Sequence, residues 1–276
     1  MDVRTSITEC EWEFFQEQGY LPLGRVLTDQ ALARLQGRID EIMLGRASIN
    51  YDRLMMQLDS DTGHYSDLSD QTSGHKGSTI GYRKIQGLEN DPLFLEYMQQ
   101  DLFRSPCHRV YGRGTDISCF RAMFMNKPAQ RGTHLPWHQD RWTRLDRDPR
   151  LSVWTALDPA TRANGCVEII PASHKRGVIN PEHPSSFLTP EQVAVHCPGD
   201  SIVYLELAAG EAALLDNWVL HSSDVNKTSI PRRAFSVCYM DARTKDEDFG
   251  TLPVVFGKGA LSPSTVGLAQ TIRINA

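Results

Sequence analysis

The sequence predicts a mainly β protein with flanking helices, in which a jelly-roll barrel carries the function. Two observations lead to this fold class. Within residues 1–110 the clearest apolar patterns have helical spacing, whereas from residue 117 the pattern alternates with a period of two. The alternating segments are short and are separated by Gly, Pro, Asn and Asp. Short strands after a helical opening are typical of a jelly roll with one sheet covered by helices.

The N-terminal segments predict helices that pack rather than carry chemistry. Residues 8–18 form a short helical pattern that stops at Gly19, and residues 20–23 look like the entry of a strand. Thr28 is the expected N-cap of a second helix that runs to about Leu44. The apolar residues that share one face of this helix are Leu32, Leu35, Ile39, Ile42 and Met43.

The middle of the chain is less regular. Residues 57–80 are polar and lack periodicity, which predicts a lid or a disordered loop. Residues 81–86 form a short strand pattern. Pro92 in the first turn then indicates a helix that runs to about Phe103.

The C-terminal half contains the strands of the expected jelly roll. The segments with period two are 118–126, 135–140, 151–157, 166–171, 201–207, 212–220 and 232–240. No internal repeat and no convincing linker divides the chain. We therefore expect one domain over residues 1–276, in which N-terminal helices (1–110) buttress a jelly-roll core (117–240).

Composition and charge exclude several kinds of partner. The formal net charge is −5 and there is no basic run, which argues against nucleic acid. No apolar run is long enough to span a bilayer, and the N-terminus lacks the apolar region of a signal peptide. The six cysteines have no CxxC spacing, which suits reduced thiols in a cytoplasmic protein. The expected partner is a small-molecule substrate.

One short motif suggests a metal site. His138 and Asp140 lie two residues apart in a predicted strand, so their side chains point the same way. Two imidazoles and one carboxylate on the same side of a metal form the facial triad of non-haem Fe(II) oxygenases. The candidate for the third ligand is His221. The pair alone is weak evidence, because short patterns recur by chance.

The motifs that follow this pair, in their order and spacing, resemble the phytanoyl-CoA dioxygenase family. The resemblance covers about residues 80–240 and includes His138-x-Asp140, Ser152–Leu157, Asn164–Lys175, His221 and Arg232-Arg-Ala. It implies a double-stranded β-helix, the cupin-like form of the jelly roll. It also implies an Fe(II)-dependent oxygenase that uses 2-oxoglutarate and O2 as co-substrates.

The resemblance assigns roles to individual residues. His138, Asp140 and His221 match the iron ligands, and Arg232 matches the arginine that binds the C5 carboxylate of 2-oxoglutarate. The alternation of the strand 232–240 independently favours Arg232 over Arg233, because Arg232 shares its face with small residues that leave room for a cofactor. The face of Arg233 carries bulky apolar residues that suit packing under helices.

Three further residues match positions that line the 2-oxoglutarate pocket of the family: Lys84, Met123 and Trp154. The competing interpretation is a solvated lysine at Lys84 and ordinary core packing at Met123 and Trp154. Polar contacts to substrate are expected from a larger set, some of which are alternatively solvated surface residues: Arg121, Asn126, Arg131, Arg141, Asn217 and Trp218.

The function implied by the resemblance is hydroxylation of an unactivated C–H bond, with release of succinate and CO2. The expected substrate is a small or medium polar metabolite, a natural-product intermediate or an acyl derivative. Related halogenases have a small residue in place of Asp140, so its carboxylate predicts hydroxylation or another oxidation rather than halogenation. Two alternatives stay open: a cupin-like metal enzyme that does not use 2-oxoglutarate, and a jelly-roll binding module without catalysis.

Overall fold

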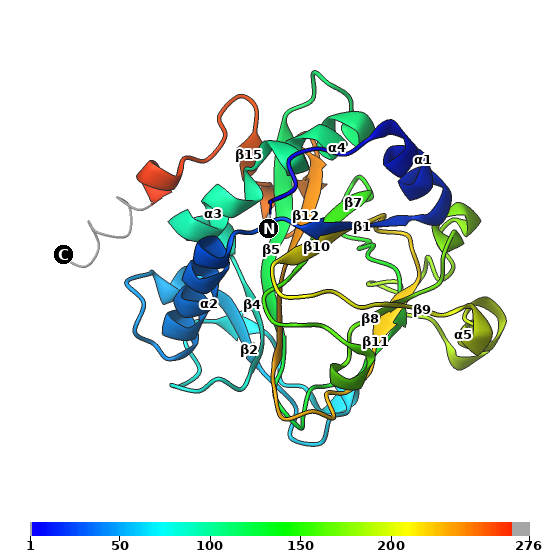
Figure 1. The fold of residues 1–276 in the computed structure, drawn as a ribbon, viewed down its shortest axis with the longest axis horizontal. Coiled ribbons are helices and arrows are strands. Elements are labelled where there is room, and N and C mark those ends of the chain that lie inside the picture. Colours follow the sequence, from blue (N-terminus) through cyan, green and yellow to red (C-terminus); the bar gives the residue numbers. More distant parts are fainter. Residues whose placement is uncertain (1, 267–276) are drawn as a thin grey trace.

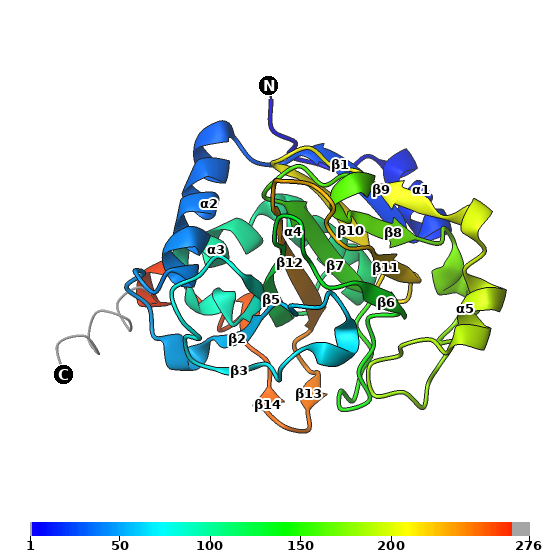
Figure 2. The same cartoon turned by 90° about the horizontal axis from the view of Figure 1, so that it is seen from below.

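Two antiparallel sheets form the body of the protein, and helices cover one of them (Figures 1 and 2). The computed structural model describes residues 2–266. A nine-stranded sheet and a four-stranded sheet face each other across a cavity that residues of both sheets line. Among the described residues no strand pairing joins the two sheets into a closed barrel. The predicted mainly β jelly roll is confirmed in this open form.

The first two helices follow the local sequence rules. Helix α1 (Glu9–Gln18) begins at Thr8, whose hydroxyl accepts a hydrogen bond from the Glu11 amide, and it ends at Gly19 in the left-handed region at φ 79°. Helix α2 (Asp29–Met43) begins at Thr28 in the same way. Its buried side chains are those expected from the sequence: Leu32, Leu35, Ile39, Ile42 and Met43.

The predicted helix after Pro92 is two helices, α3 (Pro92–Met98) and α4 (Asp101–Tyr111). The backbone leaves the helical region at Gln100, with φ −65° and ψ 143°. The side-chain amide of Gln99 donates hydrogen bonds to the carbonyls of Val255 and Leu261. These bonds connect the break to a part of the chain far away in the sequence, so local periodicity did not reveal it.

The polar segment 57–80 is not a structureless lid. Its start belongs to β2 (Met55–Leu58), and it contains β3 (Thr72–Ser73). Strand β2 pairs with both β3 and β4 (Tyr82–Gln86), so this part of the chain extends the large sheet. The prediction of a loop was wrong at these strands because their order comes from pairing rather than from alternation.

The large sheet contains the long strands of the molecule. Its order is β1 (Tyr20–Arg25), β10 (Glu211–Leu215), β7 (Leu151–Ala156), β12 (Arg232–Asp241), β5 (Ile117–Lys127), β4, β2 and β3, and β15 (Val254–Phe256) pairs with β5. Residues on one face of β12, such as Phe235, Val237 and Tyr239, join the apolar core formed with the N-terminal helices. The opposite face is left for the cavity.

The small sheet consists of short strands in the order β6 (Leu135–His138), β11 (His221–Ser223), β8 (Val167–Ile169) and β9 (Val203–Leu205). The segment 212–220, predicted as one strand, is divided: β10 lies in the large sheet, and the chain turns after it to enter β11. Helix α5 (Pro190–His196) lies beside the small sheet, as Figure 2 shows, and a hairpin joins β13 (Lys245–Asp246) to β14 (Gly250–Thr251).

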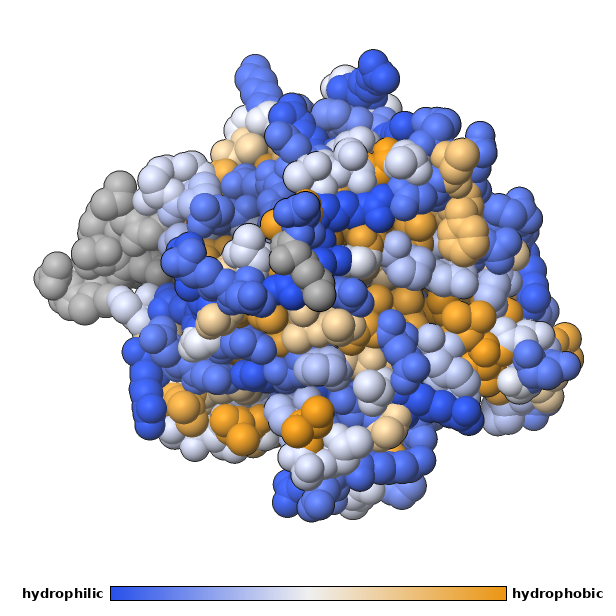
Figure 3. Space-filling view, viewed as in Figure 1, coloured by the Kyte–Doolittle hydropathy of each residue, from blue (hydrophilic) through white to orange (hydrophobic). Residues whose placement is uncertain are grey.

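The surface is polar over much of the face drawn in Figure 3, with apolar residues gathered in separate patches. The large apolar side chains that are exposed come from well separated parts of the chain, for example Ile80, Val195 and Phe249. No helix among residues 2–266 has the length and apolar character needed to cross a membrane.

Candidate active site

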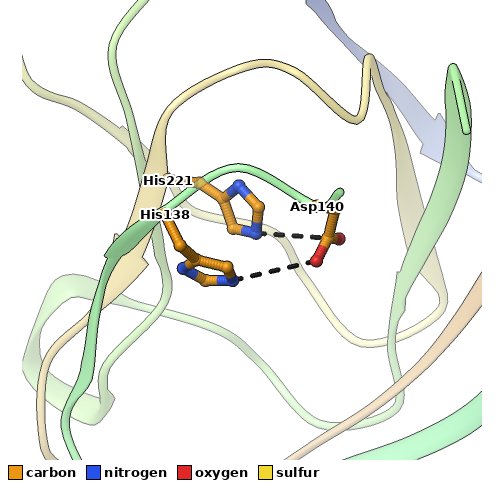
Figure 4. A group of neighbouring side chains, drawn as sticks. All are labelled: His138, Asp140 and His221. Carbon is orange, nitrogen blue, oxygen red and sulfur yellow. Dashed lines mark ion pairs between the residues drawn. The ribbon is translucent and has the colours of Figure 1, made fainter. Parts of the chain in front are cut away.

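The three predicted metal ligands converge at one point. His138 is the last residue of β6, Asp140 follows two residues later, and His221 is the first residue of β11. Strands β6 and β11 pair with His138 directly opposite His221. One ligand atom from each residue lies within 4.8 Å of the other two. Figure 4 shows both imidazole rings turned toward the carboxylate, with each Nε2 atom 3.8 Å from an oxygen of Asp140.

Both imidazoles are oriented for metal binding by backbone carbonyls. Nδ1 of His138 lies 2.8 Å from the carbonyl oxygen of Pro136, and Nδ1 of His221 lies 3.0 Å from that of Val219. A carbonyl oxygen only accepts, so each Nδ1 carries the proton and each Nε2 presents its lone pair. Burial, followed by the nearby His221 ring, holds the pKa of His138 well below its usual range. The donor set therefore fits a divalent metal ion on three of six octahedral positions.

Gln139, between the ligands His138 and Asp140, holds the surrounding loops in place. Its side chain is fully buried and donates hydrogen bonds to the carbonyls of Gly177 (2.9 Å) and Trp218 (2.7 Å). The side-chain carbonyl of Gln139 accepts a hydrogen bond of 2.8 Å from the backbone amide of Ile179. Sequence reasoning missed this residue, because its partners lie about forty and eighty positions away and no local pattern announces them.

The metal ligands lie in a cavity of about 180 Å³ between the two sheets. The large sheet supplies all four residues that the sequence predicted for 2-oxoglutarate: Lys84 on β4, Met123 on β5, Trp154 on β7 and Arg232 on β12. All four line the same cavity as the metal ligands. Their individual roles stay predictions.

Arg232 and Arg233 point to opposite faces of β12. Arg232 lines the cavity and is 4% exposed, and its Nε has no hydrogen-bond partner among the described residues. Its guanidinium carbon lies 5.5 Å from the ring centre of Trp154, and burial lowers its pKa to about 10. Arg233 instead forms salt bridges with Asp158 and Asp40 away from the cavity.

A buried guanidinium without a counterion fits a bound dicarboxylate. Burying a charge is costly unless a partner neutralises it, and a planar guanidinium forms a bidentate pair with a carboxylate. Arg233 already has carboxylate partners, whereas Arg232 has none among residues 2–266. Burial also holds the pKa of the neighbouring Lys84 well below its usual range. The cavity thus offers an unpaired cation to the co-substrate that the sequence resemblance implies.

The polar residues considered for substrate contacts divide into three groups. Arg121 and Asn126 line the cavity. Arg131 and Arg141 are paired with carboxylates, those of Asp61 and Asp148. Asn217 supports the metal centre, because its carbonyl accepts a hydrogen bond of 2.7 Å from the amide of Asp140, and Trp218 packs under the guanidinium of Arg150.

Further cavity residues were not singled out by the sequence analysis. They are two cations, Arg83 and Lys127, and three aromatic residues, Tyr65, Trp142 and Phe187. The ring of Phe187 stacks on that of His138 with centroids 4.8 Å apart. Trp142 follows the metal-binding motif closely in the sequence, which is the one local signal that pointed to its position.

The comparisons with known proteins agree with this geometry. The model of the family described as phytanoyl-CoA dioxygenase (PhyH) matches residues 15–234. A probable phytanoyl-CoA dioxygenase of Caenorhabditis elegans is 25% identical over 244 residues, which cover 82% of this chain and 73% of the relative. A phytanoyl-CoA dioxygenase of Arabidopsis thaliana is 23% identical and covers 86% of this chain and 90% of its own.

Solved structures show the same fold at low sequence identity. The structure of EctD from S. alaskensis with 2-oxoglutarate and 5-hydroxyectoine has a TM-score of 0.64 and 18% identity, and the match covers 90% of this chain and 81% of that one. The non-heme alpha ketoglutarate dependent carbocyclase SnoK from nogalamycin biosynthesis has a TM-score of 0.59 and 17% identity, with 89% of each chain covered.

The family match covers most of the described chain and includes all three candidate metal ligands and Arg232. It confirms the family and the enzyme class that the sequence resemblance implied, a 2-oxoglutarate-dependent dioxygenase. The chain belongs to the phytanoyl-CoA dioxygenase family.

Proposed function

We propose that the protein hydroxylates an unactivated C–H bond of a small or medium-sized substrate. His138, Asp140 and His221 hold Fe(II), and Arg232 binds the C5 carboxylate of 2-oxoglutarate. The observation that carries this proposal is the placement of these groups in one cavity. Two imidazole Nε2 atoms and a carboxylate converge within 4.8 Å, and an unpaired buried guanidinium lines the same cavity from the opposite sheet.

The metal ligands act through their protonation states. Burial keeps His138 neutral, so its Nε2 lone pair is available for the metal. The three ligands leave three octahedral positions for the two donor atoms of 2-oxoglutarate and for O2. When bound, the ferrous ion and 2-oxoglutarate supply the oxidation, in which the co-substrate and O2 yield succinate, CO2 and one oxygen atom for the substrate.

The large sheet binds and orients the co-substrate. In a low-dielectric cavity the bidentate pair between Arg232 and a carboxylate is stronger than in water, and it fixes the far end of the molecule. Trp154 packs against the guanidinium and limits its movement. Lys84 and Met123 line the same cavity as Arg232 and the metal ligands.

The space around the metal restricts the substrate. A cavity of about 180 Å³ is below the ~300–1,000 Å³ of sites for drug-sized ligands. Part of this space belongs to the co-substrate, so we infer that a small polar metabolite, or only the reacting end of a natural-product intermediate or acyl derivative, enters the cavity. The Phe187 ring on His138 shields one side of the metal centre from water.

The test of this proposal is the conversion of 2-oxoglutarate to succinate with Fe(II) and ascorbate. We expect slow turnover without substrate in the wild type. In Arg232→Ala the KM for 2-oxoglutarate should rise about thirtyfold or more, since removing one partner of a buried charge pair costs at least ~2 kcal/mol. The adjacent Arg233→Gln is the matched control, because Arg233 faces Asp158 rather than the cavity.

Two outcomes would contradict the proposal. An unchanged affinity for 2-oxoglutarate in Arg232→Ala would reject the role of Arg232. A wild type that binds Fe(II) but never forms succinate would favour the cupin-like enzyme without 2-oxoglutarate. If the proposal holds, mass spectrometry after incubation with a metabolite library should reveal a product one oxygen atom heavier than its substrate. A product lighter by two hydrogen atoms would show that the reaction is desaturation and not hydroxylation.

The proposal includes the organisation and the location of the protein. We propose a single domain over residues 1–276, supported by the N-terminal segments that add β1, β2 and β4 to the large sheet and Lys84 to the cavity. We also propose a cytoplasmic location, supported by cysteines that are all free in the described structure.

A further inference from the structure

The cavity carries more positive charge than the proposed co-substrate neutralises. Five basic side chains of the described residues line it, three of them arginines, against the single carboxylate of Asp140. They are Arg83, Lys84, Arg121, Lys127 and Arg232. A divalent metal ion and a dicarboxylate have opposite charges of equal size, so binding both leaves this excess unchanged. A further anion in the cavity would be favoured by its charge.

Three of these side chains, Arg121, Lys127 and Arg232, lie at different places along one pair of strands. In the antiparallel pair of β12 and β5, Arg232 is opposite Lys127, whereas Arg121 is opposite Cys238. Cys238 lies six positions after Arg232, so the two residues are roughly 20 Å apart along the strand. In the proposed function one carboxylate of 2-oxoglutarate binds the metal and the other binds Arg232. The co-substrate therefore has no carboxylate left for Arg121.

Arg121 is held in place without a direct carboxylate partner, although the charge of Asp140 acts on it from across the cavity. Its guanidinium carbon lies 4.1 Å from the ring centre of Trp142 and 5.0 Å from that of Phe120. Its Nε is buried without a hydrogen-bond partner, and among residues 2–266 its side chain forms neither a hydrogen bond nor a salt bridge. Burial lowers the pKa of its guanidinium from the usual value. The group is thus desolvated and fixed by ring contacts alone.

The neighbouring Arg144 contrasts with Arg121. Arg144 also packs against the ring of Phe120, at 5.4 Å, but it forms salt bridges with Asp246 and Asp248. Arg144 does not line the cavity, and Arg121 does. The arginine with carboxylate partners lies outside the cavity, and the one without them faces the metal centre.

We propose that the substrate carries an oxyanion group, a carboxylate or a phosphate, which Arg121 binds beside Trp142 on the Asp140 side of the metal centre. This inference rests on the proposed function and names the chemical class of its substrate. The flat contact with Trp142 leaves the N–H edge of the guanidinium for a bidentate pair with the anion. Anchoring the anion there fixes which C–H bond of the substrate approaches the metal.

The experiment is a calorimetric titration of the protein loaded with Fe(II) and saturating 2-oxoglutarate under nitrogen, so that Arg232 is occupied and no turnover occurs. The probes are inorganic phosphate and acetate, with acetamide as the uncharged control. We expect saturable binding of at least one anion to the wild type and none of acetamide. Arg121→Gln should weaken anion binding about tenfold or more, because hydrogen bonds to charged groups contribute ~1.5–3 kcal/mol.

Two further variants make the result specific. Arg144→Gln should bind the anion as the wild type does, because Arg144 lies outside the cavity. Arg121→Lys keeps the charge but loses the planar fork, so its affinity should lie between those of the wild type and Arg121→Gln. The KM for 2-oxoglutarate in the assay without substrate should stay unchanged in Arg121→Gln.

Several results would overturn the inference. They are the absence of saturable anion binding in the wild type, equal binding in Arg121→Gln, and binding of acetamide as tight as that of acetate. A rise in the KM for 2-oxoglutarate in Arg121→Gln, as large as that in Arg232→Ala, would assign Arg121 to the co-substrate instead. Failure of the proposed function looks different, since it appears as missing succinate in the wild type.

Discussion

The two sheets have different roles in the molecule. The large sheet contains strands of up to eleven residues, and helices and a continuous apolar core cover one of its faces. The small sheet has strands of only three or four residues. Yet the small sheet and the residues that follow β6 supply all three metal ligands, whereas the large sheet supplies the cations and the aromatic residue of the predicted co-substrate pocket.

The sheets are also held together differently. In the large sheet, side chains such as Phe235 fix the strands by burial between the sheet and the helices. In the small sheet, Ile169 and Leu205 pack in a separate apolar cluster. Beside its strands, polar side chains bind backbone groups: Gln139 reaches two loops, and Ser173 accepts from the amide of Leu220 at 2.8 Å. Apolar packing therefore stabilises both sheets, and hydrogen bonds of buried polar side chains also position the loops beside the small sheet. Stability and chemistry should respond to different substitutions.

The largest expected effect is the loss of the metal centre in Asp140→Ala. Removing the only carboxylate ligand should lower turnover by more than about a hundredfold, beyond the 10–100-fold losses seen when partners of metal ligands are removed. The apo protein should keep its melting temperature, since the Asp140 side chain is partly exposed and does not belong to the apolar core. Fe(II) binding and succinate formation measure the first effect, and calorimetric melting measures the second.

Asp148→Ala is the matched control for Asp140→Ala, because Asp148 pairs with Arg141 rather than pointing to the metal. It should retain Fe(II) binding. If Asp140→Ala unfolded the protein, stability and chemistry would not be separable in the small sheet.

Phe235→Ala should have the opposite effect: it should lower stability and leave Fe(II) binding intact. Its ring is fully buried and lies 4.8 Å from that of Phe94, on the face of β12 away from the cavity. The cavity left behind should lower the free energy of unfolding by about 3–5 kcal/mol. Urea unfolding measures this loss. The Fe(II) affinity of the folded fraction should remain close to that of the wild type, and a large drop in it would show that the two sheets are coupled.

Gln139→Leu tests the hydrogen bonds that the Gln139 side chain forms beside the small sheet. It should leave the carbonyls of Gly177 and Trp218 and the amide of Ile179 without their partner. We expect Fe(II) affinity to fall about tenfold, as for other partners that orient metal ligands. Fluorescence-monitored titration with Fe(II) under nitrogen would measure it.

Gln99→Leu is the matched control, since Gln99 binds two carbonyls on the other side of the molecule, those of Val255 and Leu261. It should lower stability but leave Fe(II) affinity unchanged. Equal losses of affinity in both variants would mean that Gln139 supports the fold in general rather than the metal centre.

The last prediction concerns the pH dependence of stability, at a residue beside the large sheet. Burial raises the pKa of Glu89, which lies between β4 and α3, to about 7. An acid with a raised pKa in the folded state stabilises the fold most below its unfolded value of 4.5, and this contribution is lost as the pH rises to 7. Glu89→Gln should remove this loss and raise the free energy of unfolding at pH 8 by at most about 3 kcal/mol, because one pKa unit corresponds to ~1.4 kcal/mol and the pKa rises from 4.5 to about 7. Urea unfolding at pH 5 and pH 8 tests it, and an equal change at both values would contradict it.

The sequence alone determined the parts of this protein that depend on near neighbours. Thr28 marked the start of the second helix because capping is a contact within one turn. Alternation along β12 placed Arg232 and Arg233 on opposite faces because side chains of a strand alternate by geometry. The spacing of His138 and Asp140 also predicted that both side chains point the same way, and they meet although β6 ends at His138.

Other features depend on contacts between segments that are distant in the sequence, and only the tertiary structure decided these. It paired β6 with β11 and so brought His221 to the other two ligands. It also ended the strand predicted over 212–220 at Leu215 and assembled β2 and β3 at a polar stretch. It also gave Arg144 two carboxylates and Arg121 none. The physical reason is range: capping and alternation act over a few residues, whereas strand pairing and desolvation depend on residues that the sequence separates by tens of positions.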